Sequence, residues 1–188
     1  SDQALAATPP ATAEDAAVAA ALALPGFDLV HLANSLSVRL ANRHLQPSRR
    51  RITGNRGLAG IDGTIATFCG ALTGLRDGSR GLLLIGDQAL LHDAGALALL
   101  PRRHHGLILV LNNGGGGIFD HLPVARWPAY RRLVRQERTW DFAGLAGQFG
   151  LEHVRIQDAL DVSRSATNCR NMPWIIIEIQ THNPVVTT

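Results

Sequence analysis

The segment that decides the fold is residues 82–119, LLLIGDQALLHDAGALALLPRRHHGLILVLNNGGGGIF. It contains two short apolar runs, Leu82–Ile85 and Leu107–Leu111, with a stretch of helical composition between them. Short apolar runs bounded by glycine and polar residues are typical of strands that are buried on both faces, as in parallel sheets. The segment therefore predicts a strand–helix–strand unit with a right-handed connection and two parallel strands.

A polar residue follows each of these strands. Asp87 comes after Gly86, and Asn113 comes 26 positions further along the chain. The carboxyl ends of parallel strands lie at one edge of a sheet, where open α/β sheets bind ligands, so we expect both side chains at that edge. Asp87 taken alone has a simpler interpretation as a helix N-cap or a turn residue.

A carboxylate, an amide oxygen and a backbone carbonyl together form a set of hard oxygen ligands that suits Mg²⁺. Mg²⁺ usually completes its octahedral coordination with water and substrate phosphates. The glycines at 114–117 let the backbone approach phosphates closely, and the amides that open the helix after Asp87 favour anions. The pattern therefore predicts a site for a Mg²⁺-diphosphate.

The length and composition are those of one compact domain. The chain has 188 residues, of which 46% are hydrophobic, enough for one core. No apolar run approaches the roughly 20 residues of a membrane span, and residues 1–24 lack the basic start of a secretory signal, so we expect a cytoplasmic protein. Cys69 and Cys169 have neither metal-ligand spacing nor a partner motif, which favours reduced thiols.

Nucleic-acid binding is an alternative that the charge raises. All 18 basic residues are arginine, and several cluster at 49–51 and 131–138. Against this alternative, aromatic residues make up only 5% of the chain, few for base stacking, and the second cluster also contains Glu137. We therefore expect no nucleic-acid partner.

The order of the predicted elements indicates an α/β fold. Helices are expected near 12–24, 35–45, 60–75, 89–100, 140–149 and 159–167, and strands at 27–33, 51–54, 82–85, 107–111, 153–156 and 174–179. This alternation predicts a doubly wound parallel sheet of about six strands with helices on both faces. Residues 1–26 are expected to form a linker and a lead-in helix, and residues 27–188 the compact domain. The segment 116–138 is the candidate lid.

Gly86-Asp87, the helical segment after it, the next strand and NNGGGGIF at 112–119 together resemble the diphosphate-binding motif of thiamine diphosphate (ThDP) enzymes. Within this superfamily the chain is most similar to the C-terminal domain of the MenD family, the 2-succinyl-5-enolpyruvyl-6-hydroxy-3-cyclohexene-1-carboxylate (SEPHCHC) synthases. The narrower resemblance lies in NSLSVR at 34–39, GNRGLAGIDGTIATFCGAL at 54–72 and GGIFDHLP at 116–123.

The resemblance implies a role for particular residues. The implied ligands of Mg²⁺, or of Mn²⁺ in its place, are Asp87, Asn113 and the carbonyl oxygen of Gly115. The implied contacts of ThDP also include Ile61, Gly86, Gln88 and Gly114. Ile61 matches the apolar residue that supports the bent cofactor in these enzymes, and its alternative is a core isoleucine. The implied substrate-binding residues are Asn34, Ser35, Arg39, Arg56, Ile118, Phe119 and Leu122.

The reaction that the resemblance implies is a transferase step of menaquinone or phylloquinone biosynthesis. It decarboxylates 2-oxoglutarate and adds the succinyl-semialdehyde unit to isochorismate. Both substrates are dicarboxylates, which arginine binds by paired hydrogen bonds, so Arg39 and Arg56 are the expected carboxylate-binding residues. Taken in isolation, the pattern around Arg39 favours a surface arginine over a substrate-binding one.

The activating glutamate of ThDP enzymes belongs to a pyrimidine-binding domain that is absent from this chain. No catalytic residue is therefore assigned in this chain, and we expect the chain alone to be inactive. The missing domain would come in cis or from a partner chain, in a homo-oligomer (dimer or tetramer). Two alternatives stay open: a domain of another ThDP-dependent 2-oxo-acid decarboxylase or carboligase, or a non-catalytic binding module with this fold.

Overall fold

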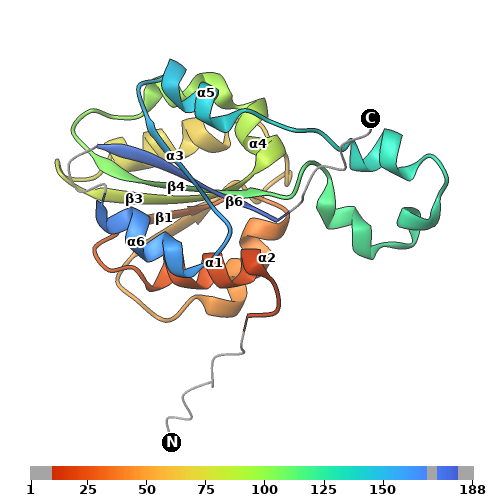
Figure 1. Ribbon diagram of the computed structural model, residues 1–188. Helices are drawn as coiled ribbons and strands as arrows, with labels where there is room; N and C mark the ends of the chain where they lie inside the picture. Colours follow the sequence, from red (N-terminus) through yellow and green to blue (C-terminus); the bar gives the residue numbers. More distant parts are fainter. Residues whose placement is uncertain (1–9, 169–172, 182–188) are drawn as a thin grey trace, which may run out of the picture.

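The computed structural model describes residues 10–168 and 173–181, which form one sheet between two layers of helices (Figure 1). Six parallel strands are hydrogen-bonded in the order β2-β1-β3-β4-β6-β5. Their bounds are β1 Leu29–Leu32, β2 Arg51–Gly54, β3 Arg80–Gly86, β4 His105–Asn112, β5 Glu152–Ile156 and β6 Trp174–Gln180. The doubly wound parallel sheet of about six strands is confirmed.

Buried residues of the central strands alternate between two cores. In β3, Leu82 and Leu84 pack on one side of the sheet and Leu83 and Ile85 pack on the other. All four side chains are fully buried, which explains why the run is apolar without interruption.

The helices divide between the two faces (Figure 1). Helices α1 (Ala13–Ala23), α2 (Leu36–His44) and α6 (Leu160–Asn168) cover one face, and α3 (Thr64–Thr73), α4 (Asp87–His92) and α5 (Phe142–Gln148) cover the other. Helix α1, which the sequence suggested as a lead-in helix, contributes the fully buried Ala17, Val18 and Ala21 to the first core.

The expected helix at 89–100 is wrong in its bounds. Helix α4 already begins at Asp87 and ends at His92, and a separate 3₁₀ segment, η1, covers Ala94–Leu99. The break lies at Asp93, whose carboxylate accepts hydrogen bonds from the backbone amides of Ile65 (2.6 Å) and Ala66 (3.2 Å). Asp93 thus caps the first turn of α3, a contact with a distant part of the chain that local helical composition does not reveal.

The segment after β4 leaves the body of the domain and returns to it (Figure 1). It consists of three short helical segments, η2 (Gly117–His121), η3 (Pro123–Arg126) and the π-helical η4 (Arg131–Arg135). Cys69 is a buried free thiol, and Cys169 lies outside the described residues, as do parts of the expected linker and domain at 1–9 and 182–188. Among the described residues, no helix is both long and apolar enough to cross a membrane.

Candidate cofactor and metal site

The parallel register brings Asp87 and Asn113 to the same edge of the sheet. Gly86 at the end of β3 lies opposite Leu111 of β4, two residues before Asn113. The loop after Asn113 then turns back toward Asp87, because the backbone amide of Gly115 donates a hydrogen bond of 2.7 Å to Asp87 Oδ2. The pairing of the two strand ends that the sequence predicted is therefore present in the structure.

Asp87 is a buried carboxylate at the first position of α4, with an exposed fraction of 3%. Its Oδ1 accepts a hydrogen bond of 2.7 Å from the amide of Gln88, and its Oδ2 accepts the bond from Gly115. Burial raises the pKa of Asp87 to about 6, although these amides and the positive charge of Arg135 oppose the rise. The site therefore disfavours a lone negative charge, which a bound cation would neutralise.

Asn113 presents an oxygen with no partner in the described part of the chain. Its Oδ1 is buried and accepts no hydrogen bond there, whereas most buried polar atoms are paired. The side chain packs against Gly117, where a β-carbon would lie 2.7 Å from Asn113 Cγ. This amide oxygen is therefore available to bind a cation.

Gly115 allows the loop to pack closely against the backbone of Arg135. Its φ of 131° is a conformation that L side chains rarely adopt, and a β-carbon would lie 2.5 Å from the carbonyl oxygen of Arg135. The Gly115 carbonyl accepts a hydrogen bond of 2.9 Å from the Gly117 amide, and a carbonyl oxygen has two lone pairs. The Asp87 carboxylate, the Asn113 amide oxygen and the Gly115 carbonyl form a set of oxygen donors that fits Mg²⁺.

A cleft of about 240 Å³ opens beside these residues. Ten of the residues proposed from the sequence line it: Asn34, Ser35, Ile61, Gly86, Asp87, Gln88, Asn113, Gly115, Ile118 and Phe119. The remaining four, Arg39, Arg56, Gly114 and Leu122, are not in its lining. Leu36, Ser37, Ala59, Ala89, Leu111 and Gly116 also line the cleft and were not proposed. They carry small or apolar side chains that no sequence pattern distinguishes from core residues.

The two arginines reach the cleft through its lining residues. Arg56 Nη1 donates a hydrogen bond of 2.7 Å to Asn34 Oδ1. Asn34 is buried, and its Nδ2 donates to the carbonyls of Asn55 (2.8 Å) and Gly60 (2.6 Å). Asn34 therefore ties the loop after β2 to the end of β1 and orients Arg56.

Ser35 has a strained backbone at the mouth of the cleft. Its φ of 69° and ψ of −129° lie outside the regions that non-glycine residues favour, at a cost of roughly 1–3 kcal/mol. Its carbonyl accepts a hydrogen bond of 2.8 Å from Arg39 Nη1, and the Arg39 side chain is exposed. Strain of this kind is concentrated at binding sites, where the surrounding structure holds a side chain in a required position.

Large apolar side chains are exposed in the two chain segments that contribute Ile61 and Phe119 to the cleft lining. The exposed fractions are 37% for Ile61, 40% for Phe119, 48% for Leu122 and 99% for Leu58. Exposed apolar surface at a cleft is typical of a binding or docking surface.

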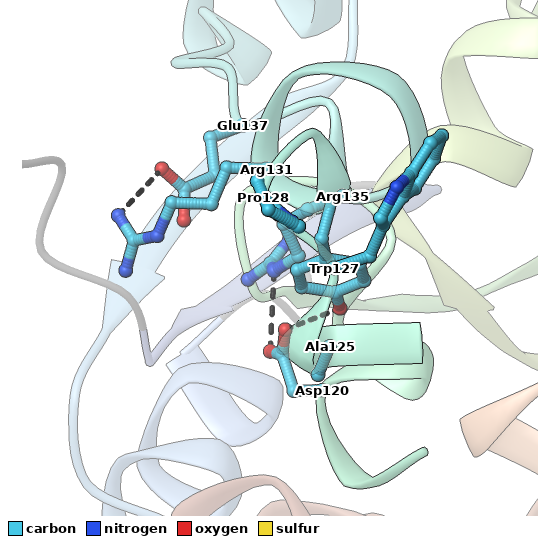
Figure 2. A pocket seen from close by; sticks show the side chains of 8 residues that line it. Asp120, Ala125, Trp127, Pro128, Arg131, Arg135 and Glu137 are labelled. Atoms are coloured by element: carbon cyan, nitrogen blue, oxygen red, sulfur yellow. Dashed lines mark hydrogen bonds and ion pairs between the residues drawn. The ribbon is translucent and has the colours of Figure 1, made fainter. Parts of the chain in front are cut away.

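Arg135 is the main residue of this region that the sequence did not predict. It is 3% exposed, and its Nη2 donates a hydrogen bond of 2.5 Å to the Asn113 carbonyl. Asp120 accepts bonds from Arg135 Nε (3.1 Å) and the Tyr130 hydroxyl (2.6 Å), at the wall of a cavity of about 390 Å³ (Figure 2). The sequence does not distinguish Arg135 from the other arginines of this segment. Its contact with the Asn113 carbonyl depends on the tertiary structure.

The backbone of the same segment closes over the glycines. The Gly116 amide donates to the Arg135 carbonyl (2.7 Å), and the Arg138 amide donates to the Gly114 carbonyl (3.1 Å). The segment 116–138, the candidate lid, therefore begins and ends at the candidate metal site.

Comparison with solved structures defines the class. Benzoylformate decarboxylase from Polynucleobacter necessarius superimposes with a TM-score of 0.72 at 14% identity, over 93% of this chain and 33% of that one. An enzyme from Mycobacterium smegmatis, proposed to depend on thiamin diphosphate, superimposes with a TM-score of 0.68 at 15% identity, over 92% of this chain and 32% of that one. The chain has the fold of ThDP-dependent enzymes.

Sequence comparison identifies the particular relatives, although no protein-family model matches the chain. The SEPHCHC synthase of Akkermansia muciniphila is 39% identical over 140 residues, 71% of this chain and 26% of that enzyme. The synthase of Salinibacter ruber is 40% identical over 165 residues, which are 84% of this chain and 27% of that enzyme. The synthase of Thermosynechococcus vestitus is 35% identical over 155 residues, which are 80% of this chain and 26% of that enzyme. The chain is a homologue of the SEPHCHC synthases and spans about a quarter of their length.

Proposed function

We propose that this chain is the ThDP- and Mg²⁺-binding domain of a SEPHCHC synthase. The complete protein would decarboxylate 2-oxoglutarate and transfer the succinyl-semialdehyde unit to isochorismate in menaquinone or phylloquinone biosynthesis. The observation that carries the proposal is that Asp87 and Asn113 line one cleft and that the buried Asn113 Oδ1 has no partner among the described residues, in a chain homologous to these synthases.

Asp87, Asn113 and the Gly115 carbonyl would hold Mg²⁺, which in turn binds the diphosphate. Bound ThDP supplies the carbanion chemistry of the decarboxylation and of the transfer. The glycines at 114–117 would let the backbone approach the phosphates, and Ile61, which lines the same cleft, would support the cofactor. Mn²⁺ has the same ligand preferences and would substitute.

The substrate groups would lie on the arginine side of the cleft. Arg39 and Arg56 each use Nη1 in a contact with a neighbouring residue, and a guanidinium has five N–H donors. The remaining donors suit the carboxylates of 2-oxoglutarate and isochorismate. Ile118, Phe119 and Leu122 would form an apolar wall that excludes water while the carboxylate is lost.

A pyrimidine-binding domain, in cis or on a partner chain, would complete the site and supply the activating glutamate. The partly exposed Ile61 and Phe119 in the cleft lining support this expectation, because docking would bury them. We propose a cytoplasmic homo-oligomer, dimer or tetramer, for the complete protein.

Calorimetric titration of ThDP into the chain with Mg²⁺ present tests the cofactor site. We expect saturable binding that requires Mg²⁺, is absent for unphosphorylated thiamine and is lost in Asp87→Ala. Asp93→Ala is the matched control, since Asp93 is a nearby carboxylate outside the cleft lining. Equal ThDP binding by the parent and Asp87→Ala would refute the assignment.

The substrate assignment needs the complete protein. We expect it to decarboxylate 2-oxoglutarate in preference to pyruvate and benzoylformate, and to require isochorismate for turnover. Preference for pyruvate or benzoylformate would instead support a different ThDP-dependent decarboxylase or carboligase. ThDP binding without decarboxylation of any 2-oxo acid would support a non-catalytic binding module.

A further inference from the structure

A buried carboxylate lies in the middle of an apolar strand close to the candidate metal site. Glu178 of β6 has an exposed fraction of 0%, and its neighbours Ile177 and Ile179 belong to the core. A buried charge is costly unless it is paired and hydrogen-bonded. Glu178 Oε2 accepts bonds from His153 Nε2 (2.8 Å) and Arg155 Nε (3.0 Å) of β5.

The other oxygen of this carboxylate leads toward the metal site. Glu178 Oε1 accepts a hydrogen bond of 2.6 Å from Asn112 Nδ2, at the last position of β4. Asn112 Oδ1 accepts a bond of 3.1 Å from the amide of Gly114. A carboxylate accepts and a backbone amide donates, so these two partners determine which end of the Asn112 amide faces which way.

The contact with Gly114 lies at the turn that presents the metal ligands. Gly114 has a φ of 75° and stands between Asn113 and Gly115. The Asn112 side chain therefore ties down the loop from one side, while the bond from the Gly115 amide to Asp87 holds it from the other.

We propose that Glu178 is a positioning residue for the metal loop, residues 113–117, and acts on it through Asn112. The inference rests on the proposed function for its metal, and it assigns a role to a residue of the neighbouring strand β6 that does not line the cleft. Glu178 orients the Asn112 amide, and Asn112 holds the Gly114 amide, so that Asn113 Oδ1 and the Gly115 carbonyl keep their places beside Asp87.

A purely structural role predicts something different. Replacing a buried ion pair by apolar residues often leaves stability unchanged or raises it. If Glu178 served only the stability of the sheet, its removal would alter all parts of the core alike. A positioning role predicts a local change at Gly114, which Glu178 does not contact.

Amide hydrogen exchange measured by NMR on the ligand-free chain tests this inference. In Asn112→Ala and in Glu178→Leu, we expect the Gly114 amide to exchange about tenfold faster, as for the loss of one hydrogen bond. The amide of Leu109, in the buried centre of β4, is the internal reference for global unfolding. Glu178→Gln keeps an oxygen that accepts from Asn112 when its Nε2 donates to His153 and the partly exposed Arg155 side chain, which cannot accept, turns to solvent. In that arrangement we expect Gly114 exchange to stay within about twofold of the parent.

Mg²⁺ affinity in the presence of ThDP is the second readout. We expect it to fall about tenfold in Asn112→Ala and Glu178→Leu, as for the removal of outer contacts of a metal site, and to be retained in Glu178→Gln. If Glu178→Leu does not fold, the comparison of Asn112→Ala with Glu178→Gln carries the test.

An unchanged exchange rate of the Gly114 amide in Asn112→Ala would overturn the inference. So would an increase in Glu178→Leu that is equally large for the amides of Gly114 and Leu109. The exchange measurement requires neither ThDP nor Mg²⁺. A failure of the proposed function is therefore distinguishable from a failure of this inference.

Discussion

The raised pKa of Asp87 predicts that the chain without metal loses stability as the pH rises. The pKa is about 6 in the folded chain, against 3.8 for an ordinary aspartate. Between these values the folded chain binds more protons than the unfolded chain, so the free energy of unfolding decreases with increasing pH. The cost of the charge is present in full above the folded pKa and disappears below the unfolded pKa.

The size of the effect follows from the shift. About two pKa units correspond to about 3 kcal/mol, of which about 2 kcal/mol develop between about pH 4 and about pH 7.5. Asp15 and Glu178 act in the opposite direction. Burial raises the pKa of each, but hydrogen bonds outweigh it and lower the pKa below its ordinary value. Their contributions must therefore be removed by comparison.

Asp87→Asn provides that comparison, because the other carboxyl groups titrate alike in both proteins. The two oxygens of Asp87 accept hydrogen bonds from the amides of Gln88 and Gly115, whereas asparagine has only one accepting oxygen. The variant therefore loses one hydrogen bond, and this loss is the same at every pH. Urea unfolding followed by tryptophan fluorescence, in a metal-free buffer series, gives the free energy of unfolding of both proteins. We expect the parent to lose about 2 kcal/mol relative to the variant from about pH 4 to about pH 7.5.

Adding Mg²⁺ and ThDP to the parent should reverse the loss at the alkaline end, because the cation neutralises the charge that burial penalises. A difference between parent and variant that stays constant within about 0.5 kcal/mol over this range would refute the reasoning, since the carboxylate would then carry no burial cost.

Three further predictions concern single residues. Asn113→Ala should weaken Mg²⁺ binding at least about tenfold by calorimetry, without lowering the urea midpoint, because it removes an oxygen that has no partner in the described chain. Gly115→Ala should destabilise the chain by roughly 2–4 kcal/mol in urea unfolding, because its β-carbon would lie 2.5 Å from the Arg135 carbonyl at a φ of 131°. Asp93→Ala should lower stability by about 1 kcal/mol in thermal unfolding, through loss of the α3 cap, while ThDP binding persists.

The sequence predicted those site residues that lie at the ends of strands. Asp87 and Asn113 each come directly after a recognisable strand, and parallel strands bring such positions to one edge. The lining of the cleft by Ser35 and Ile61 followed from the resemblance to the SEPHCHC synthases, because composition alone does not single out these residues.

The contacts that the sequence did not predict join residues far apart in the chain. Arg135 binds the carbonyl of Asn113, 22 positions away, Asp93 caps a helix 28 positions away, and Asn112 meets Glu178 66 positions away. Each of these side chains is common in loops or at strand ends, where a solvated role is the usual one.

The sequence by itself determined the doubly wound sheet, the placement of Asp87 and Asn113 at the ends of two parallel strands, and the relationship to the SEPHCHC synthases. Hydrophobic periodicity and short motifs are local properties, so they can be read along the chain. Only the tertiary structure decided that Asn113 Oδ1 has no partner in the described chain, that burial raises the pKa of Asp87, and that Glu178 reaches the metal loop through Asn112. These properties depend on which side chains packing brings together and shields from water, and that is a consequence of the whole fold.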